Sequence, residues 1–266
     1  MIVHLHASCW NEARMLPFFF RHYDRFVDHY FIRDNQSDDA SLEILAAHPR
    51  VTVQPLYLPG DSFAEAGLAQ VNQFWWPSRG KADWIAVCNI DELFWHPDLK
   101  GYLGECRDKG ITFLGSSGYQ MISTEFPAPG DDLPFAIRSG VPAPAYDKPS
   151  FFNPDAITNS GFAIGRHRAK PAGNVVRPAK EEILLLHYKY LGPEYVNVRN
   201  KELNARRRPR DIAKGYGAQY DPFVAHAQYE SFRAKAREVV PAGQRESEPR
   251  LSWPGKGRVR AKKKKN

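Results

Sequence analysis

Two adjacent acids, Asp91 and Glu92, follow the apolar run DWIAVCNI at 83–90. The run shows no alternation of apolar and polar residues, which is typical of a strand buried on both faces of a parallel sheet. An acid after such a strand commonly caps a turn or a helix. It can equally hold a cation or accept a proton in a catalytic site. The polar residues expected nearby decide between these hypotheses.

Two more polar clusters follow predicted strands. Asn11 and Glu12 come after the first strand, and the run DNQSD at 34–38 comes after the second. The carboxyl ends of parallel strands lie along one edge of an open sheet, where ligands bind. We therefore expect these clusters to meet Asp91 and Glu92 at that edge. Taken alone, the run at 34–38 also fits an ordinary polar turn.

Carboxylates gathered in this way repel one another unless a cation or hydrogen-bond donors lie among them. Mg²⁺ and Mn²⁺ prefer oxygen ligands and often bind through one or two carboxylates together with substrate phosphates. The chain contains no G-x-x-x-x-G-K-[ST] phosphate loop. The pattern therefore predicts a diphosphate substrate held through a metal ion.

Strands and helices alternate over the first 117 residues, which predicts an α/β sheet with right-handed crossovers. The predicted strands lie at 2–8, 29–33, 51–57, 83–90 and 111–117, and the helices at 14–27, 39–47, 62–76 and 98–108. Residues 123–181 are rich in proline and glycine and indicate loops and short strands. A further buried strand at 182–190 precedes a helix that begins at Pro193. We expect a single domain over 1–250, with a nucleotide-binding half at 1–120 and an acceptor and C-terminal half at 121–250.

The charge of the chain is concentrated at one end. Its net charge is +7, and residues 256–266 (KGRVRAKKKKN) alone carry seven positive charges, so residues 1–255 are neutral. A neutral body argues against a nucleic-acid-binding fold. Residues 251–266 are predicted to be a disordered basic tail. The tail either has no specific partner or contacts an anionic membrane surface, at about 1 kcal/mol per basic residue.

Cysteine usage and hydropathy predict a cytoplasmic protein. The three cysteines, Cys9, Cys88 and Cys106, show no paired spacing and are predicted to be free thiols in a reducing compartment. The N-terminus lacks the features of a signal peptide, and no segment is apolar enough to span a membrane. Peripheral contact with the inner face of the cell membrane through the tail is compatible with this localisation.

Three segments in order resemble the family 2-like glycosyltransferases: NEARMLPFFFRHY at 11–23, FIRDNQSDDAS at 31–41 and ADWIAVCNIDELF at 82–94. The resemblance is to the bacterial branch with a DIDEF-type motif and a later LLHYKYL, here at 185–191. It implies the GT-A-like fold, an open, mostly parallel sheet flanked by helices, with a loop-rich acceptor region and a helical C-terminus. It also implies inverting, metal-assisted transfer of a sugar from a nucleotide-diphosphate donor to a glycan or lipid-linked acceptor.

The resemblance also implies roles for particular residues. Asn11, Glu12 and Asp34 are expected to contact the base and ribose, Asp91 to hold Mn²⁺ or Mg²⁺, and His187 to complete the coordination of the metal. Asn89 stands where the family has an aspartate, and an amide is a poorer metal ligand. Lys148 and Lys189 are candidates to neutralise the diphosphate. The residues predicted to hold the donor are Asn11, Glu12, Asp34, Asn35, Ser37, Asp38, Asn89, Lys148 and Lys189.

An inverting transferase also needs a carboxylate that takes the proton of the acceptor hydroxyl. We expect it in the middle loops and choose Asp147, with Asp91 as the second catalytic residue. The other acids of that region are Glu125, Asp131, Asp132 and Asp155. Trp75, Trp76, Phe94 and Trp95 flank the acids at 91–92 and either stack on sugars or belong to the core.

Three rival functions remain compatible with the sequence. A metal-dependent nucleotidyltransferase would release pyrophosphate instead of a nucleoside diphosphate. A catalytically decayed transferase would bind a glycan without turning over a donor, and Asn89 favours this reading. An RNA-binding role would depend on the tail at 256–266.

Overall fold

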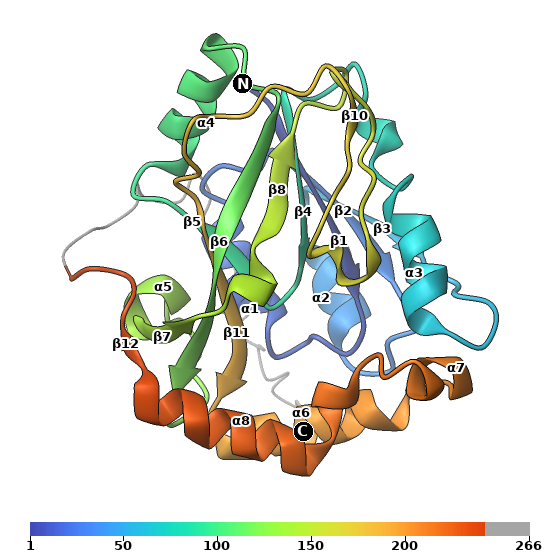
Figure 1. Ribbon diagram of the computed structural model, residues 1–266, viewed down its shortest axis with the longest axis vertical. Helices are drawn as coiled ribbons and strands as arrows, with labels where there is room; N and C mark the ends of the chain where they lie inside the picture. The colour runs from blue at the N-terminus through green and yellow to red at the C-terminus, as the bar shows by residue number, and fades with distance from the viewer. Residues whose placement is uncertain (243–266) are drawn as a thin grey trace, which may run out of the picture.

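The computed structural model describes residues 1–242 and contains a ten-stranded sheet with helices packed on it (Figure 1). The strand order is β12-β7-β6-β8-β4-β1-β2-β3, and β11 pairs with β6 and β5 outside this path. The strands of this sheet are β1 (Val3–Cys9), β2 (His29–Asp34), β3 (Val51–Pro55), β4 (Trp84–Asn89), β5 (Glu92–Trp95), β6 (Phe113–Ser123), β7 (Ser139–Pro142), β8 (Lys148–Phe152), β11 (Leu184–Leu191) and β12 (Arg237–Glu238). A separate pair is formed by β9 (Ile157–Asn159) and β10 (Ala172–Gly173).

Helices alternate with the strands in the first part of the chain, and three of them follow one another after β11. The α-helices are α1 (Leu16–Tyr23), α2 (Ser41–Ala47), α3 (Phe63–Val71), α4 (Leu99–Asp108), α5 (Leu133–Ala136), α6 (Pro193–Ala205), α7 (Pro209–Ala213) and α8 (Pro222–Lys235). Short 3-10 helices are η1 (Trp76–Ser78), η2 (Pro144–Tyr146), η3 (Ile164–Arg166) and η4 (Ala218–Tyr220). The predicted α/β class, the open sheet flanked by helices and the helical C-terminal part are confirmed.

The first half of the sheet is parallel, as predicted. β1 lies between β2 and β4, and β3 extends the sheet beyond β2. In this register Cys9 pairs with Asp34, and Ser8 pairs with Asn89. The ends of β1, β2 and β4 therefore lie side by side, and the predicted meeting of the three polar clusters at one edge is confirmed.

The second half of the sheet adds antiparallel strands. β8 lies between β4 and β6 and is antiparallel to both, and β7 is antiparallel to β6. The acids at 91–92 lead directly into β5, which pairs antiparallel with β11. The sequence did not predict β5, because its four residues follow β4 after a two-residue turn and are too few to show a period of their own.

Both faces of the sheet are covered by apolar side chains. Along β4, Trp84, Ala86 and Cys88 belong to the larger core cluster, whereas Ile85 and Val87 belong to a second cluster on the opposite face. This explains why the strand shows no alternation in sequence. Three of the four aromatics predicted as core or sugar-stacking residues (Trp75, Phe94 and Trp95) are buried, whereas Trp76 is 48% exposed. All three cysteines are free and buried, as predicted.

The C-terminal helices lie across the carboxyl end of the sheet. Figure 1 shows α6, α7 and α8 across the end toward which β6 and β11 point. A third apolar cluster joins Ile122 and Tyr190 of these strands to Val196, Ala225 and Tyr229 of α6 and α8. Within residues 1–242, no helix has the length and apolar character needed to cross a membrane. The predicted tail at 251–266 falls outside the described residues.

Two histidines of β1 are held neutral inside the fold. His4 Nδ1 and His6 Nε2 lie 2.9 Å and 2.7 Å from the same hydroxyl, Ser78 Oγ. Burial lowers the pKa of His4 to about 4, with a further contribution from the neighbouring His29. Burial also lowers the pKa of His6 well below its ordinary value. His4 and His6 are therefore buried structural residues of β1.

We expect the free energy of unfolding to decrease as the pH falls from about 6.5 toward 4. In this window the unfolded chain binds a proton at His4 that the folded protein does not bind, so protonation favours unfolding. The shift at His4 corresponds to a loss of up to about 3 kcal/mol by pH 4. Urea unfolding at pH 7.5, 5.5 and 4.5 should show a shallower decrease for His4→Leu than for the wild type. The exposed His226→Gln is the control, and an unchanged slope in His4→Leu would contradict this account.

Candidate active site

A cavity of about 780 Å³ opens at the carboxyl ends of β1 and β4. The end of β1 and the residues after it contribute Ser8, Cys9, Trp10 and Glu12, and the end of β4 and the residues after it contribute Asn89–Glu92. Residues of α6, α7 and η4 also line the cavity. A volume of this size is typical of ligand-binding clefts, which span about 300–1,000 Å³. The cations that line the cavity are Arg33, Lys148, Lys189, Arg199, Arg206 and Arg207, and the acids are Glu12, Asp91, Glu92 and Asp211. The excess of cations favours an anionic ligand.

The polar residues that meet at the sheet edge fall into two groups: some line the cavity, and others bind one another in a turn. Asp34 accepts hydrogen bonds from the backbone N–H and the hydroxyl of Ser37. Ser37 Oγ accepts from the backbone of Asn11, whose side-chain amide donates to Asp38 Oδ1 at 2.6 Å. These four residues bind one another and do not line the cavity. Their contacts are those of a polar turn that holds the β1–α1 loop against the β2–α2 loop, and their predicted contact with a nucleotide stays a prediction.

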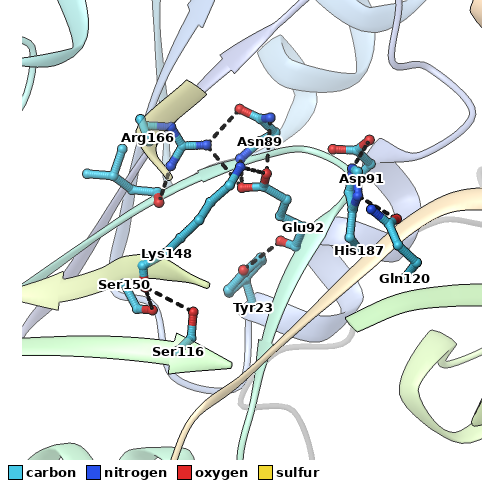
Figure 2. Close-up of polar contacts among 11 residues, drawn as sticks. Tyr23, Asn89, Asp91, Glu92, Ser116, Gln120, Lys148, Ser150, Arg166 and His187 are labelled. Atoms are coloured by element: carbon cyan, nitrogen blue, oxygen red, sulfur yellow. Dashed lines mark hydrogen bonds and ion pairs between the residues drawn. The ribbon is translucent and has the colours of Figure 1, made fainter. Parts of the chain in front are cut away.

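Glu92 is the centre of a buried network of charges (Figure 2). Its side chain is 0% exposed and forms ion pairs with Lys148 and, at 3.0 Å, with Arg166. The backbone N–H of Asn89 donates to Glu92 Oε2 at 3.0 Å, and the Asn89 amide donates to Oε1 at 3.2 Å. Burial by itself would raise the pKa of Glu92, but Lys148 and Arg166 hold it far below its ordinary value. Glu92 is therefore ionised, and both of its carboxylate oxygens already accept hydrogen bonds or form ion pairs.

The local backbone explains how Arg166 reaches this network. Gly165 (φ 72°) and Arg166 (φ 58°) both adopt left-handed conformations. A Cβ atom at Gly165 would lie 2.6 Å from the ring of His167, so glycine is needed there. The Arg166 guanidinium donates to Val87 O at 2.6 Å and to Asn89 Oδ1 at 2.8 Å.

These contacts give a physical reason for the amide at position 89. The Asn89 side chain donates to Glu92 and accepts from Arg166, which requires one donor and one acceptor in the same group. An aspartate here would place a second carboxylate against Glu92. Asn89 lines the cavity, but its amide already has both partners, so it is not a free metal ligand.

Asp91 lies on the other side of this turn and meets His187 from β11. Asp91 Oδ2 is 3.1 Å from His187 Nε2, and His187 Nδ1 is 2.8 Å from Gln120 Oε1 (Figure 2). His187 Nδ1 thus faces the amide oxygen of Gln120, and Nε2 faces the Asp91 carboxylate. Burial by itself would raise the pKa of Asp91, but His187 keeps it below its ordinary value.

The pair formed by Asp91 and His187 fits a divalent cation. The Asp91 carboxylate oxygen and His187 Nε2 are 3.1 Å apart, which is favourable only when a proton or a cation lies between them. A histidine whose second nitrogen donates to an amide or carboxylate oxygen has the usual arrangement of a metal ligand. Ligand atoms of Asp91, Glu92 and His187 all lie within 4.8 Å of one another. Because Glu92 is committed to Lys148 and Arg166, Asp91 and His187 are the residues available to a metal ion.

Lys189 presents an uncompensated positive charge to the cavity. Its side chain is buried, with 6% of the residue exposed, and its ammonium group has no hydrogen-bond partner among the described residues. The ammonium lies 5.5 Å from the centre of the Tyr190 ring and 5.0 Å from that of Tyr220. Burial lowers the pKa of Lys189 to about 8, while Asp91 acts in the opposite direction. An unpartnered buried cation costs free energy and indicates that an anion binds there.

Aromatic and basic side chains also line the cavity near Glu12 and Trp10. Glu12 forms an ion pair with Arg199 of α6, which also donates to Trp10 O at 2.9 Å. The Arg206 guanidinium lies 3.7 Å from the centre of the Trp10 ring and 4.9 Å from that of Phe63. The Arg206 guanidinium therefore covers part of the Trp10 ring, and Trp10 and Phe63 both line the cavity.

α7 closes one side of this end through Asp211. The Asp211 carboxylate accepts from Ser62 Oγ at 2.6 Å and from the backbone N–H of Phe63 at 2.8 Å, at the start of α3. Ser62 also caps α3 by accepting from the backbone N–H of Glu65, as the S-x-x-E pattern indicates. The rim of the cavity is thereby connected to a helix far away in the sequence.

The residue predicted as the catalytic base lies outside the cavity. Asp147 is exposed, and its Oδ1 accepts from the backbone N–H of Gly118 at 2.7 Å. It does not line the cavity. Three of the four other middle-loop acids also have structural contacts: Asp131 accepts from Ala128 N, Asp132 pairs with Arg25, and Asp155 accepts from Gly80 N. The role of Asp147 as a base stays a prediction.

Several residues of the site were not predicted from the sequence. Arg166, Arg199, Gln120 and Tyr146 all contact residues of the site from distant elements. Arg166 stands beside His167 in a stretch that reads as a basic loop, and Arg199 lies in a helix rich in charge. Neither position carries a spacing signal. Of the residues predicted to hold the donor, Glu12, Asn35, Asn89, Lys148 and Lys189 line the cavity together with Asp91 and His187.

Comparison with known proteins assigns no family to this chain. No family model and no curated protein matches it. Among solved structures, S. aureus TarS 1–349 has a TM-score of 0.41 at 8% identity and covers 92% of this chain and 98% of its own. The complex of TarS 1–349 with UDP has a TM-score of 0.36 at 10% identity, covering 58% and 47%, and TarS has 0.39 at 9%, covering 77% and 39%. The chain thus spans about two fifths of the length of TarS. All three TM-scores are below 0.5, so these similarities do not indicate a function for this chain.

Proposed function

We propose that this protein is a glycosyltransferase that moves a sugar from a nucleotide-diphosphate donor to a glycan or lipid-linked acceptor, with inversion and with the help of a metal ion. The observation that carries the proposal is the meeting of Asp91, His187 and the unpartnered Lys189 in one cavity at the carboxyl edge of the parallel strands. This edge is where ligands bind in open α/β sheets.

Different residues of the cavity would bind different parts of the nucleotide-sugar donor. We assign the nucleobase to Trp10 and Phe63 and the ribose to Glu12 and Asn35, which all line the cavity. Lys189 faces the diphosphate and offers it charge-assisted hydrogen bonds. Lys148 is held in place by Glu92, so its charge is positioned before the ligand arrives.

A metal ion held by Asp91 and His187 would offset the negative charge that develops on the leaving diphosphate. Gln120 keeps His187 in the orientation that this requires. The buried positions of Lys148 and Lys189 exclude water around the diphosphate and strengthen their interaction with it. Lys148 and Lys189, together with a metal ion held by Asp91, would thus offset the charge of the leaving group.

Thermal unfolding with UDP, GDP or CDP, each with and without Mn²⁺, tests the proposal. One nucleotide should stabilise the protein, and a ligand at 100 times its dissociation constant adds about 2.7 kcal/mol. Incubation with the matching nucleotide sugars should then release a nucleoside diphosphate. Release of pyrophosphate would instead identify a nucleotidyltransferase. Absence of stabilisation by every nucleotide would contradict the proposal and leave a glycan-binding protein as the alternative.

Replacing Lys189 separates stability from binding. We expect Lys189→Met to keep or raise the melting temperature, because it removes a buried charge without a partner. The same change should weaken nucleoside diphosphate binding about 10-fold or more, since a hydrogen bond to a charged group contributes about 1.5–3 kcal/mol. Calorimetric titration with the stabilising nucleotide measures the loss. Exposed Lys201→Met on α6 is the matched control, and a destabilised Lys189→Met with unchanged affinity would contradict the assignment.

A further inference from the structure

A second cavity of about 490 Å³ adjoins the first on the side of β6, η2 and α8. Aromatic rings form much of its wall: Tyr146, His167, Tyr190 and Phe232. Tyr190 and Phe232 pack edge to face, with ring centres 5.2 Å apart, and Tyr146 and His167 do the same at 5.3 Å. The rings thus support one another in fixed orientations. Flat apolar faces of this kind suit a ligand with an apolar face of its own.

The polar groups of the second cavity are amides. Gln120, Gln219 and Gln228 line it. A side-chain amide carries two donors and an acceptor, and the oxygen of Gln120 already faces His187 Nδ1. Gln228 Oε1 accepts from the Tyr190 hydroxyl at 2.8 Å, which leaves its NH₂ group for a ligand. No lining residue is a carboxylate, and Arg168 is the one Lys or Arg of the lining set. Such a surface matches the hydroxyl groups of a neutral or acidic sugar and has no counter-ion for a cationic ligand.

The two cavities meet at the candidate reaction centre. Tyr146, His167 and Gln219 line both of them. The Tyr146 ring stacks on His187, with ring centres 4.7 Å apart, and Gln120 of the second cavity binds the same histidine. A ligand in the second cavity is therefore separated from Asp91 and His187 by a single aromatic ring.

We propose that the second cavity is the acceptor subsite and that it holds one sugar unit, with a ring face on the aromatic wall and hydroxyl groups on the glutamine amides. This inference rests on the proposed transferase function and deepens it, because it identifies the acceptor group as a sugar and gives it a location. The sugar approaches the donor past Tyr146.

Blocking the cavity with a large side chain tests this location without altering the donor site. Ala145 of η2 is exposed and lines only the second cavity, so Ala145→Trp fills it. Exposed Ala234 of α8 lines neither cavity, and Ala234→Trp is the matched control. The probes are the methyl glycosides of glucose, galactose, mannose, N-acetylglucosamine and glucuronic acid. Their binding to the full chain is measured by saturation-transfer NMR, with and without UDP and Mn²⁺.

We expect at least one methyl glycoside to bind the wild type and Ala234→Trp, and its signal to be lost in Ala145→Trp. Stabilisation by the nucleotide should be the same in all three proteins. If no glycoside binds the wild type, or if Ala145→Trp binds as well as the control, the acceptor subsite is overturned while nucleotide binding stands. If Ala145→Trp loses nucleotide binding instead, the second cavity belongs to the donor and the inference fails. If the wild type binds no nucleotide at all, the proposed function itself is refuted. This outcome is distinguishable from the failure of the acceptor subsite, in which nucleotide binding remains.

Discussion

Glu92→Gln should lower the free energy of unfolding by about 3–5 kcal/mol, the usual cost of breaking a buried ion pair by removing one partner. The substitution leaves the buried ammonium of Lys148 and the guanidinium of Arg166 without the carboxylate that compensates both. Glutamine has nearly the same shape, so the loss reports the charge and not a cavity. Urea unfolding at pH 7 measures it.

The control for this prediction is an exposed acid in an ordinary surface pair. Glu105→Gln removes a partner of Lys109 in α4, where both side chains are more than half exposed, and should change stability by less than about 1 kcal/mol. Adding Lys148→Met to Glu92→Gln should restore part of the lost stability, because it removes one of the two uncompensated cations. A loss below about 1 kcal/mol in Glu92→Gln would contradict the role of Glu92 as the anchor of Lys148 and Arg166.

Asp91→Asn should lower the rate of sugar transfer about 10³-fold, equivalent to about 4 kcal/mol of transition-state stabilisation. The amide keeps the shape of the side chain but removes the negative charge that faces His187 Nε2. Mn²⁺ should then no longer increase the thermal stabilisation by the nucleotide. Stability without ligand should change little, because Asp91 is only partly buried and its side chain is 25% exposed.

Release of nucleoside diphosphate and thermal unfolding with nucleotide, each with and without Mn²⁺, are the measurements for Asp91→Asn. Asp108→Asn at the exposed end of α4 is the matched control and should behave as the wild type. If Asp91→Asn retains the effect of Mn²⁺, the metal does not bind at Asp91 and His187. In that case Lys148 and Lys189 would be left as the groups that neutralise the diphosphate.

The alternation of elements could be read from the sequence because it depends on local patterns. The apolar runs at 83–90 and 182–190 predicted β4 and β11, and the S-x-x-E pattern predicted the start of α3. The place where the polar clusters meet followed from the same pattern, since parallel strands must end at the same edge. β5 was missed because a four-residue strand after a two-residue turn has no period of its own.

Within the clusters, identical residue types proved to have different tasks. Asp34 and Asp38 bind neighbours in the turn, whereas Asp91 faces the cavity and Glu92 is covered by cations. The sequence cannot separate these cases, because the task of a carboxylate depends on which donors reach it. The two cationic donors of Glu92 come from positions 56 and 74 residues further along the chain.

The sequence by itself determined the α/β class, the parallel strands and the edge at which a site must lie, because these follow from periodicity along the chain. Only the tertiary structure decided which side chains form that site. It gave Glu92 two cations, joined Asp91 to His187, and left Lys189 without a partner. The physical reason is that charge compensation is a property of three-dimensional neighbours: a buried charge is stable, reactive or poised for a ligand according to what lies within a few ångströms of it.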